Sequence, residues 1–264
     1  MNNRPIGIFD SGVGGLTVLN AVTKILPKED IIYFGDTARV PYGNKSKSTI
    51  VKFSTDNILF LLRKKVKMVI VACNTASALA LDYLQGIFNV PIIGVIEAGA
   101  VKALEMSQSK KIAIIGTRST IASGSYEKAI VKRAKEAKVY TKACPLFVPF
   151  VEEGIVKGKT VQRIVEMYLA DFKRSDIDVI ILGCTHYPLL KNEIAQYLKG
   201  VHIVDSATEV AFHAKNVLAA HKSLRYERRR GTQEFYVTDE PRGFMKLATL
   251  FLKRQIKKPG VVNV

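Results

Sequence analysis

The chain alternates between short apolar runs and longer stretches with helical periodicity, and this alternation limits its possible folds more than any other feature. The apolar runs end in small or polar residues, and the strands that they predict span 6–9, 31–35, 68–71, 92–95, 111–115, 139–142, 179–182 and 202–204. The helical patterns between them span 16–25, 46–64, 75–85, 98–107, 124–137, 160–174 and 188–198. Continuous apolar strands that alternate with helices are typical of a parallel sheet covered on both faces. The pattern therefore predicts an α/β fold.

The sequence also repeats parts of itself. "MVIVACNT" at 68–75 matches "VIILGCTH" at 179–186, and "IGIFDSG" at 6–12 matches "VHIVDSA" at 201–207. Apolar strands can resemble one another by chance, but here the polar residues at the strand ends match as well. We therefore predict two similar parallel-sheet α/β lobes with a pseudo-twofold relation. The active site is expected in the cleft between them, beyond the carboxyl ends of the strands.

Composition narrows the class of protein. Hydrophobic residues make up 48% and charged residues 24% of the chain, which is typical of a globular protein. The longest apolar runs are too short to span a bilayer, so no membrane contact is predicted. The N-terminal sequence lacks the pattern of a signal peptide. Three cysteines without a CxxC pair argue against a disulfide scaffold or a metal site, and they favour a cytoplasmic protein.

The formal net charge of +17 is the least ordinary feature of the composition. Residues 215–264 hold 12 of the Lys and Arg side chains against 4 Asp and Glu. Such a region attracts nucleic acid, acidic membranes or anionic metabolites. No base-reading or aromatic-interleaved motif accompanies the charge, so a solvated basic surface is the simpler interpretation. Nucleic-acid contact through the basic C-terminal region is retained as an alternative.

Cys73 and Cys184 are the residues best suited to acid–base chemistry. Each is expected at the corner between a strand and a helix, where backbone N–H groups and the helix dipole favour a thiolate. A cysteine can also be a small buried apolar residue. That second interpretation fits Cys144, which precedes a proline and has no such corner.

Polar residues follow both cysteines. Asn74 and Thr75 follow the first, and Thr185 and His186 follow the second. Side chains of this kind at the start of a helix commonly cap it, and together with the helix N–H groups they can also hold a carboxylate. His186 is in addition a candidate proton partner for the neighbouring thiol.

The glycine-rich segment at 10–16, "DSGVGGL", follows the first predicted strand. Its glycine spacing differs from that of a dinucleotide-binding fingerprint. Asp10 and Ser11 are expected to point into the cleft, where Asp10 would pair with an ammonium group or tune a nearby thiol. A tight turn with a capping Asp is the alternative.

Three further segments are candidates for the site. The backbone N–H groups of Tyr42 and Gly43 lie in a turn-rich loop and could bind an anion. "GTRST" at 116–120 is a weaker candidate for the same task. Glu152 and Glu153 are adjacent acids, and either both are solvated or one of them orients the histidine after the second cysteine.

Six motifs in the same order carry a resemblance to a known family. "DSGVGGLTVL", "YFGDTARVPYGNKS", "ACNTASA", "CPLFVPFVEEG", "LGCTHYPLL" and "VDSA" together resemble bacterial glutamate racemase, of the cofactor-independent aspartate/glutamate racemase superfamily. The similarity runs from about residue 5 to 245. It implies racemisation of L-glutamate to D-glutamate for peptidoglycan synthesis and cell-wall formation, by an enzyme that needs no cofactor and is often a homodimer.

The resemblance also implies roles for individual residues. Cys73 and Cys184 correspond to the two acid/base residues, Asp10 to the acid near the first thiol, and Glu152 and His186 to the pair that supports the second. The implied substrate-binding residues are Asp10, Ser11, Tyr42, Gly43, Asn74, Thr75, Thr185 and His186. The implied lobes are residues 1–96 with 208–264, and residues 97–207.

Three alternatives remain at this point. A racemase for aspartate would share the fold and would be distinguished by its turnover of the two amino acids. A basic nucleic-acid-binding protein would bind DNA in a salt-dependent way and would lack racemase activity. A dithiol redox protein would form a reversible disulfide between Cys73 and Cys184.

Overall fold

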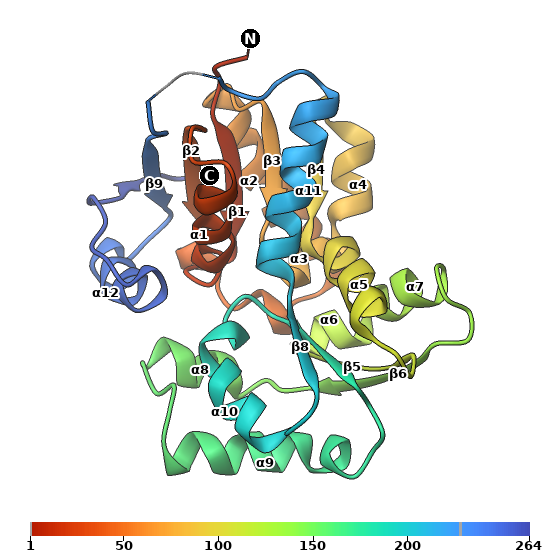
Figure 1. Ribbon diagram of the computed structural model, residues 1–264. Coiled ribbons are helices and arrows are strands. Elements are labelled where there is room, and N and C mark those ends of the chain that lie inside the picture. The colour runs from red at the N-terminus through yellow and green to blue at the C-terminus, as the bar shows by residue number, and fades with distance from the viewer. Residues whose placement is uncertain (1, 227–228) are drawn as a thin grey trace.

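The computed structural model describes residues 2–226 and 229–264, and it contains two separate parallel sheets (Figure 1). Arg228 of the basic C-terminal region lies outside the described residues. The first sheet has the order β10-β9-β2-β1-β3-β4. Its strands are β1 (Ile6–Asp10), β2 (Ile31–Gly35), β3 (Met68–Val71), β4 (Ile92–Gly94), β9 (Gln233–Val237) and β10 (Gly260–Val261). The second sheet has the order β6-β5-β7-β8, with strands β5 (Lys111–Gly116), β6 (Lys138–Ala143), β7 (Val179–Gly183) and β8 (His202–Asp205). Two parallel-sheet α/β lobes are therefore confirmed.

The strand order of the second sheet repeats that of the first. The order β2-β1-β3-β4 corresponds to β6-β5-β7-β8, so β3 and β7 are equivalent strands. Cys73 and Cys184 follow these two strands, which agrees with the first sequence repeat.

The second sequence repeat is wrong as evidence of duplication, because the equivalent of β1 is β5 and not β8. The likeness has a local cause. Asp10 Oδ2 accepts a hydrogen bond from Gly12 N at 3.0 Å, and Asp205 Oδ1 accepts one from Ala207 N at 3.0 Å. Both segments thus form the same Asp-based turn at the end of a strand.

The helices mostly lie where the apolar periodicity predicts them, but their bounds differ. They are α1 (Leu16–Ile25), α2 (Lys47–Arg63), α3 (Asn74–Leu79), α4 (Leu81–Ile87), α5 (Val95–Met106), α6 (Arg118–Ala122), α7 (Ser125–Val131), α8 (Phe147–Glu152), α9 (Lys159–Lys173), α10 (Lys191–Tyr197), α11 (Ser206–Ala220) and α12 (Pro241–Leu252). The 3₁₀ helices are η1 (Thr37–Arg39), η2 (Tyr42–Asn44) and η3 (Tyr187–Leu190).

Three expected helices need correction. The helix expected at 75–85 is divided at Ala80 into α3 and α4. The one expected at 124–137 ends at Val131, because no residue from there to Ala137 is buried and the helix has no further apolar face. The one expected at 188–198 begins with the 3₁₀ helix η3.

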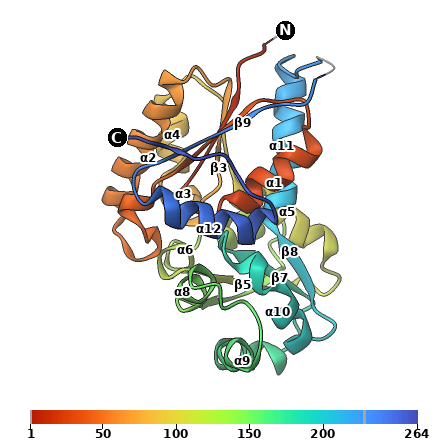
Figure 2. The same ribbon diagram turned by 90° about the vertical axis from the view of Figure 1, so that its left-hand side faces the viewer.

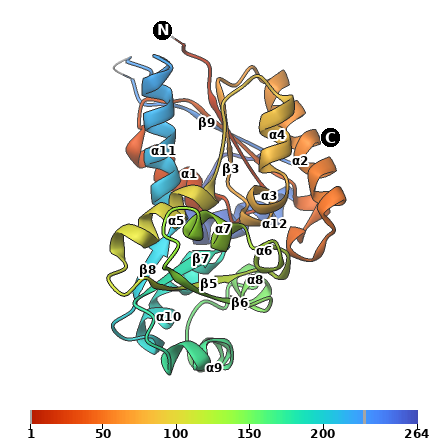
Figure 3. The same ribbon diagram turned by 90° about the vertical axis from the view of Figure 1, so that its right-hand side faces the viewer.

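Helices cover both faces of each sheet, as apolar parallel strands require. In the first lobe, α1 and α11 lie on one side of the sheet and α2 and α4 on the other (Figure 2). In the second lobe, α5 and α7 lie on the side of the sheet opposite α9 and α10 (Figure 3). One core cluster runs through both lobes and includes residues of α1, α9, α11 and α12. No helix within residues 2–226 and 229–264 is both long and apolar enough to cross a membrane.

Candidate active site

A cavity of about 510 Å³ lies where the carboxyl ends of strands from both sheets meet. Its lining includes Ser11, Cys73 and Asn74 from the first lobe and Thr117, Cys184 and His186 from the second. Cavities of this volume accommodate small molecules. The cavity therefore occupies the cleft that the strand pattern predicts.

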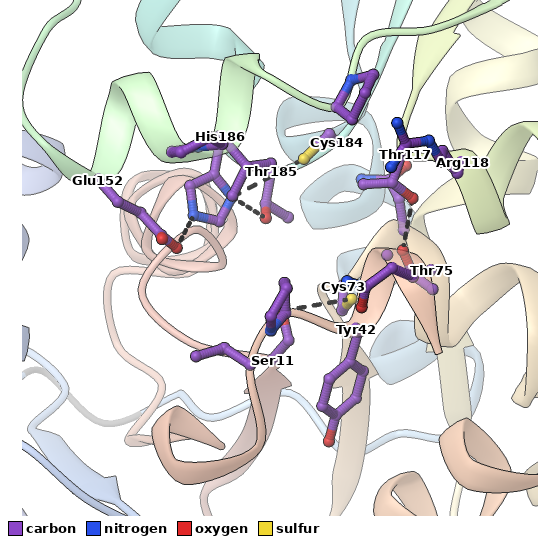
Figure 4. A pocket seen from close by; sticks show the side chains of 18 of the residues that line it. Ser11, Tyr42, Cys73, Thr75, Thr117, Arg118, Glu152, Cys184, Thr185 and His186 are labelled. Atoms are coloured by element: carbon purple, nitrogen blue, oxygen red, sulfur yellow. Dashed lines mark hydrogen bonds and ion pairs between the residues drawn. The ribbon is translucent and has the colours of Figure 1, made fainter. Parts of the chain in front are cut away.

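The two candidate thiols lie on opposite walls of this cavity, and Figure 4 shows their sulfur atoms facing the space between them. Both side chains are buried apart from this space, with exposed fractions of 5% for Cys73 and 6% for Cys184. Both are free thiols. Cys144 is fully buried and does not line the cavity, in agreement with a structural role.

Cys73 has a hydroxyl group and a buried carboxyl group as neighbours. The thiol donates a hydrogen bond to Ser11 Oγ at 3.8 Å. Burial raises the pKa of Cys73 to about 12, and the negative charge of Asp10 contributes to the increase. These surroundings favour the protonated thiol of Cys73.

Asp10 differs in position from the sequence-based expectation. It is fully buried and is not among the residues that line the cavity. Its carboxylate accepts hydrogen bonds from Gly12 N at 3.0 Å and from Thr185 Oγ1 at 3.4 Å. Burial raises the pKa of Asp10 despite these contacts. Of the two roles expected for Asp10, this placement fits tuning of the nearby thiol.

Cys184 has a histidine and a carboxylate as neighbours. Its Sγ atom lies 3.8 Å from His186 Nδ1, and His186 Nε2 lies 3.1 Å from Glu152 Oε1. Burial alone would lower the pKa of His186, but hydrogen bonds with Cys184 and Glu152 outweigh burial and raise it to about 10. The adjacent Glu153 is exposed and does not line the cavity. The sequence could not tell these two acids apart, because the histidine is 34 residues away in the chain.

Donors from both lobes meet on the side of the cavity next to Cys73. Thr75 Oγ1 lies 3.0 Å from Thr117 Oγ1 and 3.2 Å from Thr120 Oγ1. Asn74 Oδ1 accepts a hydrogen bond from Tyr126 OH at 2.7 Å, which leaves the amide nitrogen of Asn74 to face a ligand. These hydrogen bonds join the two lobes at the wall of the cavity that holds Asn74, Thr75 and Thr117.

Sequence reasoning missed Arg118, which lines the cavity beside Thr117 (Figure 4). The signal is present in the "GTRST" segment, for which the sequence predicts only weaker anion binding. The strand order strengthens the case that this segment belongs to the site, because β5 is the equivalent of β1. Thr117 then occupies the position that corresponds to Ser11.

The phenol of Tyr42 anchors a loop that lines the cavity. In Figure 4 its ring points away from the two sulfur atoms, and its hydroxyl donates to Asp36 and accepts from Asn57 Nδ2. The neighbouring Gly43 must lack a side chain, because a methyl group there would lie 2.6 Å from Thr117 Cβ. The phenol thus anchors the loop, whose backbone reaches both the cavity and the opposite lobe.

Two parallel-sheet α/β lobes meet at one cavity of small-molecule size, and each lobe places a free thiol on its wall. The family model for Asp/Glu/Hydantoin racemase matches residues 13–214. The chain belongs to this family, and it is an isomerase of the racemase type.

Named relatives agree with this assignment. The chain is 49% identical to the glutamate racemase of Aquifex aeolicus (strain VF5) over 252 residues, which cover 96% of this chain and 95% of the relative. Among solved structures, it is similar to glutamate racemase isoform RacE1 from Bacillus anthracis, with a TM-score of 0.96, 37% identity and coverage of 100% of this chain and 99% of that one. It is also similar to the glutamate racemase from Francisella tularensis subsp. tularensis SCHU S4 in complex with D-glutamate, with a TM-score of 0.94, 40% identity and coverage of 100% and 98%.

Proposed function

We propose that this racemase interconverts L-glutamate and D-glutamate without a cofactor, with Cys73 and Cys184 as its two acid/base groups. The observation that carries the proposal is that the two free thiols lie on opposite walls of one cavity. Glutamate is proposed as the substrate because the chain is similar to glutamate racemases, one of which was solved in complex with D-glutamate.

The reaction removes a proton from one face of the α-carbon and delivers another proton to the opposite face. With L-glutamate, the Cys184 thiolate takes the α-proton, and the Cys73 thiol gives its proton to the other face. With D-glutamate the roles are exchanged. Each turnover leaves the protonated and deprotonated thiols interchanged, so proton exchange with solvent restores the starting state.

The α-proton is weakly acidic, so the negative charge that develops must be stabilised at the α-carboxylate. Asn74, Thr75 and Thr185 are the donors proposed for that carboxylate. The backbone N–H groups of Tyr42 and Gly43 are proposed to bind the side-chain carboxylate, with Ser11 beside them. The substrate then spans the two walls with its α-carbon between the thiols.

The neighbours of each thiol are proposed to assist its proton transfer. His186, held by Glu152, exchanges a proton with Cys184. Asp10 keeps Cys73 in its protonated form at rest, since a nearby negative charge opposes a second one. Two observations support these roles. His186 Nδ1 lies 3.8 Å from Cys184 Sγ, and Asp10 is fully buried.

The test uses three cysteine variants and circular dichroism of L-glutamate. Cys73→Ala and Cys184→Ala should each abolish racemisation and leave the far-ultraviolet spectrum unchanged. Cys144→Ala is the matched control, because this thiol is buried outside the cavity, and it should racemise normally. Full turnover by either cavity variant would refute the two-thiol proposal. Parallel assays with L-aspartate test the choice of glutamate.

We further propose that the enzyme is a cytoplasmic homodimer whose D-glutamate supplies peptidoglycan synthesis, as the family resemblance implies. The proposed lobes are residues 1–96 with 208–264, and residues 97–207. The return of the chain to the first sheet through β9 supports this division. Nucleic-acid contact through the basic C-terminal region stays a prediction, to be checked by salt-dependent DNA binding.

A further inference from the structure

The C-terminal helix α12 reaches the candidate active site, although its sequence carries no motif. Its buried residues Phe244, Ala248 and Phe251 follow the spacing of one helical face. Figure 2 shows the helix lying across the junction of the two lobes. At its end, the ring of Phe251 packs edge-to-face against His186, with ring centroids 5.8 Å apart and an interplanar angle of 88°.

We propose that Phe251 is a positioning residue for His186, and that α12 thereby controls the proton transfer at Cys184. The proposal rests on the two-thiol mechanism proposed above. It assigns a role in the reaction to a segment that otherwise completes the apolar core.

The hydrogen bonds of His186 leave its ring incompletely fixed. Nε2 is held by Glu152, whose side chain is 36% exposed, and Nδ1 lies 3.8 Å from Cys184 Sγ. Thr185 Oγ1 lies 3.5 Å from the same Nδ1 atom, and both contacts of Nδ1 are long, so they only weakly fix the rotation of the ring about its Cβ–Cγ bond. The second side-chain torsion of a histidine is intrinsically broad, so packing must select the ring orientation. Phe251 supplies that packing, and an edge-to-face contact depends strongly on the angle between the rings.

The packing residue is itself held in place. Phe251 is 7% exposed and belongs to the core cluster that runs through both lobes. Earlier on the same face, Phe244 packs on Tyr33 with ring centroids 5.9 Å apart. Phe251 is therefore held against His186 by the core that surrounds it, and not by a hydrogen bond of its own.

The test separates positioning from simple core packing by comparing two variants of one helix face. Phe251→Leu removes the ring against His186, and Phe244→Leu is the matched control, which loses an aromatic contact without touching His186. Primary isotope effects on kcat/KM are measured with α-deuterated L-glutamate and α-deuterated D-glutamate. Circular dichroism and urea unfolding establish that both variants fold.

Phe251→Leu should lower kcat/KM roughly 10-fold, less than the ~100-fold that a 1 Å misplacement can cost. Because only the Cys184 step is slowed, the isotope effect should rise with L-glutamate and fall with D-glutamate. Phe244→Leu should leave the ratio of the two isotope effects as in the wild type. The inference is overturned if Phe251→Leu also leaves that ratio unchanged, or if both variants change it equally.

The cysteine variants distinguish the two levels of the proposal. If Cys73→Ala or Cys184→Ala keeps full turnover, the two-thiol mechanism itself is contradicted. The wild-type isotope effects then test the role of Phe251. If the wild type shows both effects and Phe251→Leu leaves their ratio unchanged, only the role of Phe251 is contradicted. Phe251→Met provides a second change of packing at the same position, in case the leucine variant does not fold.

Discussion

Substitution of Gly14 by alanine should disturb both the contact between the lobes and the chemistry at Cys184. Gly14 lies between β1 and α1, against the residues that follow the second thiol. A methyl group at this position would lie 2.2 Å from Thr185 Oγ1 and 2.6 Å from His186 Nδ1. To reach the 3.4 Å of an ordinary contact, the Thr185 hydroxyl must move by about 1.2 Å.

The size of this displacement sets the expected effects. A misplacement of about 1 Å at a reacting site can lower the rate ~100-fold, which corresponds to about 2.7 kcal/mol of transition-state stabilisation. Overpacking of a buried contact also costs about 1–3 kcal/mol of the free energy of unfolding. Gly14→Ala should therefore lower kcat/KM ~100-fold, measured by circular dichroism of L-glutamate. Its urea midpoint should decrease as well.

Gly86→Ala is the control for this substitution. Gly86 lies in α4, and a methyl group there would meet no atom within 4 Å. Alanine in a helix should raise the free energy of unfolding by about 0.5–1 kcal/mol and leave turnover unchanged. If Gly14→Ala racemised glutamate within about twofold of the wild-type rate, the close approach of Gly14 to Thr185 and His186 would not matter for catalysis, and the reasoning would fail.

Two further predictions concern stability. The Lys67 ammonium lies 2.6 Å from Glu29 Oε2, and both side chains are almost completely buried, so Lys67→Met should cost about 3–5 kcal/mol in urea unfolding because it leaves a buried carboxylate unpaired. Lys102→Met breaks an exposed pair and should cost less than about 1 kcal/mol, and equal losses would contradict this reasoning. Burial opposes the ionisation of Asp30, but hydrogen bonds from Arg229 and other donors outweigh it and hold the pKa well below 3.8. The unfolded state then binds more protons, so this stabilisation is present above the unfolded pKa and is lost as the pH falls through the folded pKa. Asp30→Asn should make the melting temperature less dependent on pH below about pH 5. An unchanged pH dependence would exclude this role of Asp30.

The fold was predictable from sequence because its signals are local. Each buried strand is an apolar run, and most runs end in small or polar residues at the edge of the sheet where ligands bind. The same locality placed both cysteines at the cavity, since a strand-to-helix corner is visible within eight residues such as 68–75. It also caused the error over the second repeat, because an Asp-based turn has a similar sequence wherever it ends a strand.

The partners of the site residues could not be predicted without the structure, because they are distant in sequence. Tyr126 holds the amide of Asn74 from 52 residues away. Phe251 reaches His186 from α12, a helix whose apolar face reveals nothing about what it contacts. Strand order was needed to show that Thr117 corresponds to Ser11.

The two lobes repeat their topology without repeating the chemistry around their thiols. Cys73 lies beside a hydroxyl and a buried carboxyl group, whereas Cys184 lies beside an imidazole held by Glu152. This asymmetry is compatible with racemisation, because L- and D-glutamate have equal free energies in solution. Their equilibrium constant is therefore unity, which forces kcat/KM to be equal in the two directions whatever surrounds each thiol. Differences between the two walls can appear only in the separate kcat and KM values and in the isotope effect of each proton transfer. Selection for turnover therefore does not require the surroundings of the two thiols to match, and each lobe can hold its thiol with the groups that its own strands and helices supply.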